Sequence, residues 1–85
     1  MTDPQIGIDV IVSGQTVDVS INPHQTVEHL VHDALNRSGN KGQEPSGWSL
    51  KTQSGNAIEQ GQTISQAGIH AGDTLYLNPV TGAGG

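Results

Sequence analysis

The apolar residues of this chain change their spacing between residues 21 and 26, and that change is the strongest constraint on the fold. Between residues 6 and 21 they alternate with smaller or polar residues, as in strands that bury one face. Between residues 26 and 37 they recur about every 3.6 positions, as on an amphipathic helix. A hairpin that continues into a helix predicts an α+β domain, in which the helix packs across one face of a sheet.

Local signals mark the ends of these elements. Ser13-Gly14-Gln15 predicts the turn of the hairpin. Thr26 is suited to cap the helix at its N-terminus, and Gly39 is suited to end it in the left-handed conformation. The apolar stripe of the helix consists of Val27, Leu30, Val31, Ala34 and Leu35.

The second half of the chain contains shorter apolar segments separated by polar turns. We expect, in chain order, a loop over residues 38–47, a strand over 48–51, a brief edge strand at 57–58, a 3₁₀-like turn over 63–68 that buries Ile64, and a last strand over 74–77. The last strand is expected to pair with the first at the centre of the sheet. The predicted fold is therefore a mixed sheet of four to five strands with one helix across it.

Composition narrows the classes of function. The chain has 85 residues, a formal net charge of −5, three Lys or Arg residues and no Cys. Such an acidic chain does not suit a nucleic-acid interface or an anionic membrane surface, and without thiols it supplies neither a cysteine nucleophile nor a thiolate metal site. No apolar run reaches the roughly 18 residues of a membrane span, so we expect a cytoplasmic protein. The length of the chain suits a single domain, which we expect to be monomeric.

The glycine-rich C-terminal segment suits a chemical role. Pro79 lacks a backbone donor and should close the last strand, so we expect a folded domain over residues 1–78, with its core from about residue 6, and a flexible tail over residues 79–85. Gly84 and Gly85 place a carboxylate on a backbone without side chains, which can enter a narrow enzyme channel. The carboxylate of Gly85 is then the expected reactive group.

Several segments taken together resemble ubiquitin. They are the Ile-rich opening hairpin, Pro23 followed by Thr26-Val27-Glu28, Gly39 after the helix, Gly61-Gln62-Thr63-Ile64-Ser65, Asp73-Thr74-Leu75-Tyr76-Leu77, and Gly84-Gly85. The resemblance covers nearly the whole chain from about residue 6. It identifies the chain as a member of the β-grasp superfamily and implies a ubiquitin-like fold.

Within that superfamily the chain most resembles a bacterial ubiquitin-like modifier. The resemblance implies that an activating enzyme adenylates Gly85 with ATP and passes it on as a thioester, and that a conjugating enzyme joins it to a target protein. A deconjugating protease is a further expected partner, whereas the chain itself binds no cofactor and is not an enzyme. Gly84 and Gly85 are the conjugation residues. Thr81, Gly82 and Ala83 replace the basic residues that precede ubiquitin's glycines, which implies recognition by a dedicated enzyme.

Two other functions stay open. Residues 78–82 resemble the sulfur carrier proteins of the molybdopterin and thiamine pathways, in which the same adenylate becomes a terminal thiocarboxylate. We favour the modifier because residues 26–28 and 61–65 are more similar to ubiquitin than to the carriers. The third alternative is a β-grasp interaction module without a chemical role for the tail, as in secretion-associated ubiquitin-like proteins.

Some side chains of the predicted strands and loops are candidates for contacts with partners. Tyr76, Lys51 and Asn78 have outward parity and form a candidate partner surface, where ubiquitin has an exposed apolar patch. Lys41 and Lys51 are the only lysines and are therefore the candidate acceptors for self-conjugation. Trp48 has inward parity and is expected in the core.

The histidines of the helix raise the question of a metal site. His29 and His32 are three residues apart on the predicted solvent face, with Glu28 and Asp33 nearby. A tight site needs three or four convergent ligands, so we interpret these residues as a solvated helix face and predict no metal site. A catalytic Ser/His/Asp set would need a pocket that such a small core hardly provides.

Overall fold

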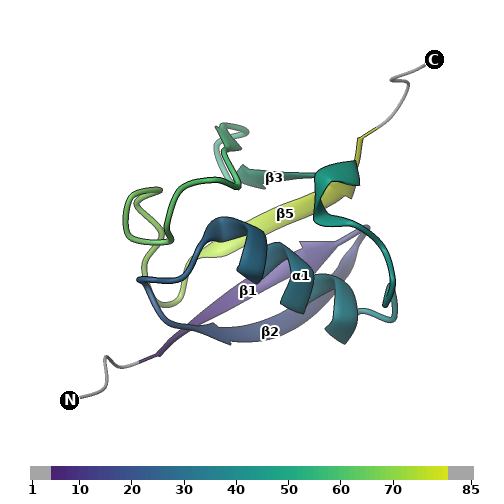
Figure 1. Ribbon diagram of the computed structural model, residues 1–85, viewed down its shortest axis with the longest axis horizontal. Helices are drawn as coiled ribbons and strands as arrows, with labels where there is room; N and C mark the ends of the chain where they lie inside the picture. Colours follow the sequence, from purple (N-terminus) through teal and green to yellow (C-terminus); the bar gives the residue numbers. More distant parts are fainter. Residues whose placement is uncertain (1–4, 81–85) are drawn as a thin grey trace.

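The last strand of the sequence lies in the middle of the sheet. The computed structural model describes residues 5–80, which form one five-stranded sheet and one α-helix (Figure 1). In chain order the elements are β1 (Ile6–Val12), β2 (Gln15–Ile21), α1 (Val27–Arg37), the 3₁₀ turn η1 (Pro45–Gly47), β3 (Trp48–Thr52), β4 (Ala57–Ile58) and β5 (Thr74–Pro79). The strand order is β2-β1-β5-β3-β4, so the predicted interior position of β1 and β5 is confirmed.

The first two strands form the predicted hairpin and are paired along their whole length. Its two-residue turn has a positive φ at Ser13 (49°) and at Gly14 (90°). A turn of this kind follows the right-handed twist of the strands, and glycine adopts it without strain. Alternate residues of the hairpin then face the core, and the buried ones are Ile8, Val10, Val12, Val17, Val19 and Ile21.

The sheet is mixed because β5 runs parallel to β1 and antiparallel to β3. Leu75 lies opposite Val10, and Leu77 lies opposite Val12 on one side and Leu50 on the other. All five of these side chains are buried on the same face. The parallel pairing therefore joins the hairpin and the second half of the chain into one core.

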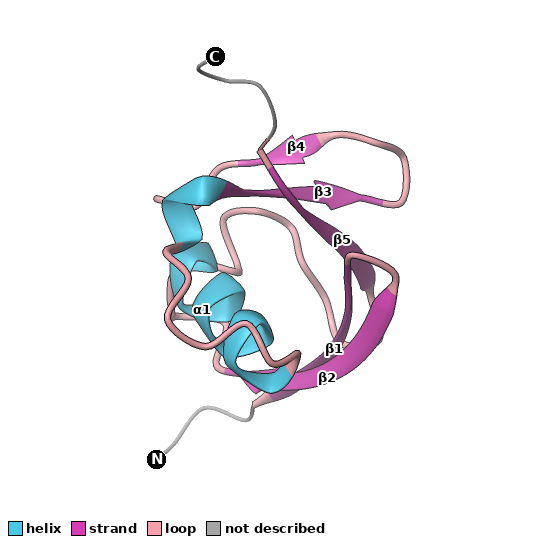
Figure 2. Cartoon of the chain, turned by 90° about the vertical axis from the view of Figure 1, so that its right-hand side faces the viewer, coloured by secondary structure: helices cyan, strands magenta, loops and turns pink. Residues whose placement is uncertain are grey.

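The helix α1 packs across the inner face of this sheet (Figure 2). Its predicted caps are confirmed: the Thr26 hydroxyl accepts a hydrogen bond from the N–H of His29 at 3.3 Å, and Gly39 follows the C-cap Ser38 with a φ of 85°. The five residues of the predicted apolar stripe are all buried. The helix thus covers the face that the strands leave apolar.

The first turn of α1 is also bonded to a distant loop. The N–H of Val27 donates to the carbonyl of Gln62 at 2.8 Å, and the N–H of Glu28 donates to the carbonyl of Gln60 at 3.0 Å. These bonds satisfy two of the N–H groups that a helix leaves free at its start. Ile64, which follows the loop, is fully buried. The two segments that are more similar to ubiquitin than to the sulfur carriers, residues 26–28 and 61–65, therefore lie side by side.

The strand β5 is two residues longer than predicted and ends at Pro79, opposite Trp48. The carbonyl of Leu77 accepts a hydrogen bond from Ser13, which shows that Leu77 directs its backbone groups toward β1. The nitrogen of Pro79, two residues on, points to the same side, where β1 has already ended. Its missing N–H breaks no ladder bond, so Pro79 belongs to the domain and not to the tail.

Two other expectations differ from the structure in detail. The predicted loop over residues 38–47 contains η1, whose first residue Pro45 occupies the position that proline favours in a helix. Residues 63–68 bury Ile64 as predicted and include a 3₁₀-like turn, in which the N–H of Gly68 donates to the carbonyl of Ser65 at 3.1 Å, but a wider turn accompanies it. The N–H of Ala67 reaches the carbonyl of Thr63, four residues earlier, which is the spacing of an α-turn. In the part of the chain from residue 5 to residue 80, no helix has the length and apolar character needed to cross a bilayer.

A buried leucine of the central strand tests this arrangement. Leu77 is fully buried, so Leu77→Ala should lower the free energy of unfolding by about 2–5 kcal/mol because it leaves a cavity. Asn78→Ala changes the exposed neighbour and should alter the same quantity by less than about 0.5 kcal/mol. Urea denaturation monitored by Trp48 fluorescence measures both variants. Equal effects would contradict the inward orientation of Leu77.

Candidate functional site

The residues just before the glycine-rich segment are held against the start of β3. The N–H of Val80 donates to the carbonyl of Gly47 at 2.9 Å, and Val80 is 51% exposed. Because β1 and β5 run parallel, this end of β5 lies at the opposite end of the sheet from Ile6 (Figure 1). The segment that follows Val80 thus starts from a fixed point on the domain.

Two hollows adjoin Val80. The first, of about 460 Å³, is lined by the apolar residues Trp48, Leu50, Ile58 and Val80 together with Glu28, Ser46, Ser49, Gln60 and Gly61. The second, of about 300 Å³, is lined by Ser49, Lys51, Asn78, Pro79 and Val80. We call the first the Trp48 hollow. The two differ in character, since the first combines apolar side chains with a carboxylate and the second is mostly polar.

One glutamine side chain organises the wall of the Trp48 hollow. The Gln60 amide nitrogen donates to the carbonyls of Pro45 and Trp48, each at 2.9 Å. These bonds fix η1 and the first residue of β3 relative to the loop that also receives the helix start. Three segments that are distant in sequence are therefore joined beside Val80.

The candidate partner surface lies on the exposed face of the sheet. Lys51 is opposite Tyr76, and Ser49 is opposite Asn78, in the antiparallel pair of β3 and β5. Tyr76 is 37% exposed, and Lys51 and Asn78 are exposed as well. The outward parity of Tyr76 is confirmed, and so is the inward position of Trp48, which is 9% exposed. The structure brings these three surface residues together, and their role in binding stays a prediction.

The residues expected to carry conjugation lie outside the described part of the chain. They are Gly84 and Gly85, and the residues expected for tail recognition, Thr81, Gly82 and Ala83, lie outside it as well. The two candidate acceptors are exposed, Lys41 in the loop after α1 and Lys51 on β3. Their role as acceptors stays a prediction.

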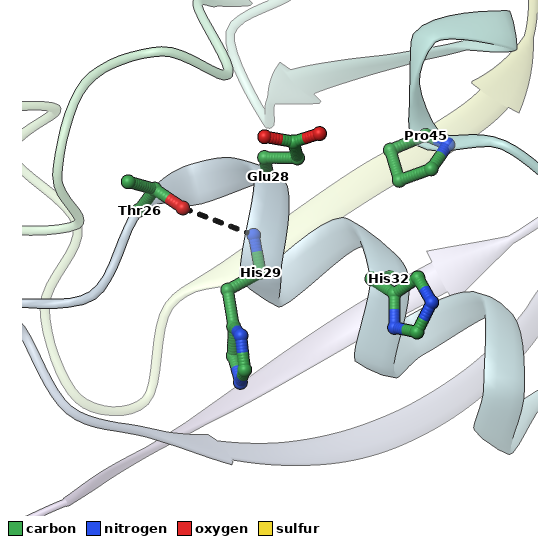
Figure 3. Close-up of a pocket in the computed structure, with 5 residues that line it drawn as sticks. All are labelled: Thr26, Glu28, His29, His32 and Pro45. Carbon is green, nitrogen blue, oxygen red and sulfur yellow. Dashed lines mark hydrogen bonds between the residues drawn. The ribbon is translucent and has the colours of Figure 1, made fainter.

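The helix histidines line a separate, shallow pocket (Figure 3). This pocket, of about 240 Å³, is lined by Thr26, Glu28, His29, His32 and Pro45. Glu28 and His29 point away from each other, and both histidines are exposed (Figure 3). Between residues 5 and 80, no group of three or more His, Asp or Glu side chains is placed to bind one metal ion. The structure brings the two histidines to one pocket and does not bring a third ligand to them.

Two carboxylates face each other on the outer side of the hairpin. Asp9 on β1 is the register partner of Asp18 on the edge strand β2. A hydrogen bond with Asp18, and then the charge of Asp18, raise the pKa of the Asp9 carboxyl above its ordinary value. Like charges placed directly opposite destabilise a strand pair, so this pair opposes folding where both groups are ionised.

Sequence reasoning did not identify Gln60 and Val80 as parts of the site. Gln60 acts on Trp48 and Pro45, which are 12 and 15 residues away, and Val80 bonds to a residue even more distant in the chain. The spacing of neighbouring residues in the sequence does not predict such long-range contacts. The proline at the start of η1 was the one local signal that could have marked this wall.

The carboxylate pair predicts a pH-dependent stability. Because the pKa of Asp9 is raised in the folded state, protonation of this carboxyl stabilises the fold. This stabilisation is complete below the ordinary pKa of Asp9 and is lost as the pH rises through the raised value. Asp18→Asn removes the repulsion and should raise the thermal midpoint slightly at pH 7. The gain should vanish at a pH below the ordinary pKa of Asp9. Thermal melts at both pH values, with Glu59→Asn as an exposed control, measure this; a gain that persists in acid would contradict the explanation.

Solved structures of ubiquitin-like proteins superpose on this chain. A designed protein based on ubiquitin has a TM-score of 0.80 at 22% identity, with 99% of each chain covered. The ubiquitin of Caldiarchaeum subterraneum has a TM-score of 0.73 at 18% identity, covering 93% of this chain and 98% of that one. The C-terminal ubiquitin-like domain of human 2'-5'-oligoadenylate synthetase-like protein has a TM-score of 0.77 at 21% identity, covering 98% and 92%. The predicted ubiquitin-like β-grasp fold is thereby confirmed.

Sequence comparison places the chain in a family. It is 30% identical over 81 residues to the uncharacterized protein y4jI of Sinorhizobium fredii. The match covers 95% of this chain but 62% of that relative, so the chain spans less than two thirds of the relative's length. The family model described as "Protein of Unknown function (DUF2604)" matches residues 1–85, and the chain therefore belongs to this family.

Proposed function

We propose that this protein is a ubiquitin-like modifier that is joined to target proteins through the carboxylate of Gly85. One combination supports the proposal: a ubiquitin-like fold whose central strand β5 ends in the exposed residues Asn78 and Pro79 and is followed in the sequence by Gly84-Gly85. The bond between Val80 and Gly47 fixes the point from which the following residues start. In this proposal the folded domain, which is little more than one small packed core, serves to present the two glycines to partner enzymes.

The chemistry of the proposal needs partner enzymes, because a resting carboxylate is a poor electrophile. An activating enzyme joins the Gly85 carboxylate to the AMP part of ATP and releases pyrophosphate. An enzyme thiolate then displaces AMP to form a thioester, and a target amine displaces the thiol to form an amide. The chain has no cysteine, so every thiol in this scheme belongs to a partner enzyme. In this proposal the chain is the protein substrate of these enzymes and is not itself an enzyme. The reactions take place in the cytoplasm, where ATP is present, and a deconjugating protease hydrolyses the amide bond to the target.

A sulfur carrier is the second candidate function. It shares the adenylation step, but sulfide then attacks the adenylate, displaces AMP and leaves a thiocarboxylate on Gly85. The junction between the helix start and the loop at Gln60 and Gln62 favours the modifier, since both of its segments resemble ubiquitin. A β-grasp interaction module that is never conjugated is the third candidate, and it needs no glycine end.

Removal of the two glycines tests the proposal. A tagged chain produced in its native host should appear in mass spectra as adducts with Gly85 in an amide bond to a target side chain. Deletion of Gly84 and Gly85 should abolish these adducts because the chain then ends at Ala83, without the glycine carboxylate to activate, whereas Gln43→Ser, an exposed change in the loop after α1, should leave them unchanged as a control.

Each alternative result of this experiment has a separate interpretation. A Gly85 in which sulfur has replaced a carboxylate oxygen would identify a sulfur carrier. Unmodified protein in every sample, with or without the glycines, would contradict both functions and favour the interaction module. An intact mass showing that the cellular chain continues past Gly85 without trimming would also contradict the proposal.

A further inference from the structure

The lining of the Trp48 hollow combines four apolar side chains with polar residues and one exposed carboxylate. Its apolar part includes the edges of Trp48 and Ile58, each 9% exposed, together with the almost fully buried Leu50. Val80 stands at its rim and is the most exposed large apolar residue between residues 5 and 80. The hollow therefore offers a place for an apolar side chain of another protein, with Val80 as one wall.

The charge of the hollow is negative. Glu28 lines it and is exposed, and Figure 3 shows its carboxylate on the opposite side of the helix from the His29 ring. None of the described residues that line the hollow is Lys or Arg. In the region from residue 5 to residue 80, the Glu28 carboxylate has no ion pair with a basic side chain. A Lys or Arg from a partner could therefore pair with Glu28 without displacing an existing cation.

The position of the hollow indicates which partner would use it. Val80 lines the hollow, bonds to Gly47 and directly precedes the segment that ends in Gly84-Gly85. A protein that acts on those glycines must approach along this end of β5.

We propose that the Trp48 hollow is the docking site for the activating enzyme, which inserts an apolar side chain against Trp48 and Ile58 and pairs a Lys or Arg with Glu28. This inference rests on the proposed function, and it adds a second recognition element outside the glycine-rich segment. It explains how an enzyme can select this chain although the residues before the glycines carry no charge. The apolar contact supplies affinity, and the charge pair supplies selectivity and orientation.

Reversal of the charge at the hollow tests the inference. Glu28→Arg should lower the yield of Gly85 adducts in the native host by about tenfold or more, because it opposes a partner's cation at close range. Glu28→Gln should lower it less. Asp18→Arg makes the same charge change on the exposed face of β2 and should leave the yield unchanged.

The apolar part of the site needs its own variants. Val80→Ser should lower the adduct yield severalfold because it removes the apolar side chain at the wall of the hollow. Val80→Leu keeps an apolar side chain there and should retain most of the wild-type yield. Circular dichroism and thermal melts must show that each variant is folded, since Glu28 also faces the positive end of α1. Val80 is exposed, so its substitution should leave the melt almost unchanged.

The possible results separate the two proposals. If wild-type protein forms adducts and both Glu28→Arg and Val80→Ser form them equally well, the docking inference is wrong and the proposed function stands. If Asp18→Arg reduces the yield as much as Glu28→Arg, the effect reflects net charge and the inference is again wrong. If the wild-type protein forms no adducts, both proposals are wrong.

Discussion

The parallel pairing of β1 with β5 is the interaction on which the rest of the structure depends. Without it the hairpin and the strands β3 and β4 would be two small sheets, each too small to bury its apolar face. With it, Val10 and Val12 meet Leu75 and Leu77 in one continuous core beneath α1. The same pairing directs the end of β5 away from the start of β1, which separates the candidate site from the N-terminal end of the sheet.

A second set of contacts determines the character of the candidate site. The helix start is bonded to the loop at Gln60 and Gln62, and Gln60 is bonded to η1 and to β3. Glu28 is thereby held beside Trp48, although 20 positions separate them in the chain. An acidic group next to apolar side chains is a specific combination, and this domain has it where its last strand reaches the surface. The acidic and apolar groups of the candidate site thus lie together at the end of the sheet where β5 ends.

Most of the fold could be predicted from the sequence because its signals are local. The alternation of β1 and β2, the apolar stripe of α1 and the caps at Thr26 and Gly39 each depend on neighbours a few positions away. The length of β5 could not be predicted in this way, because whether Pro79 is tolerated depends on where β1 ends. The site was only partly predictable for the same reason: the outward parity of Tyr76 is a local property, whereas the bonds of Gln60 and Val80 depend on the folded arrangement.

The central place of β5 also has a consequence for synthesis of the protein on the ribosome. Residues 74–79 are translated late, and until they emerge β1 has only β2 as a neighbour and β3 lacks the strand that connects it to the hairpin. At bacterial or eukaryotic elongation speeds this leaves the nascent chain without its middle strand for several seconds. The domain can therefore close only after nearly its whole length has been made, and a nascent chain stalled before residue 74 would expose the apolar side of its hairpin to chaperones.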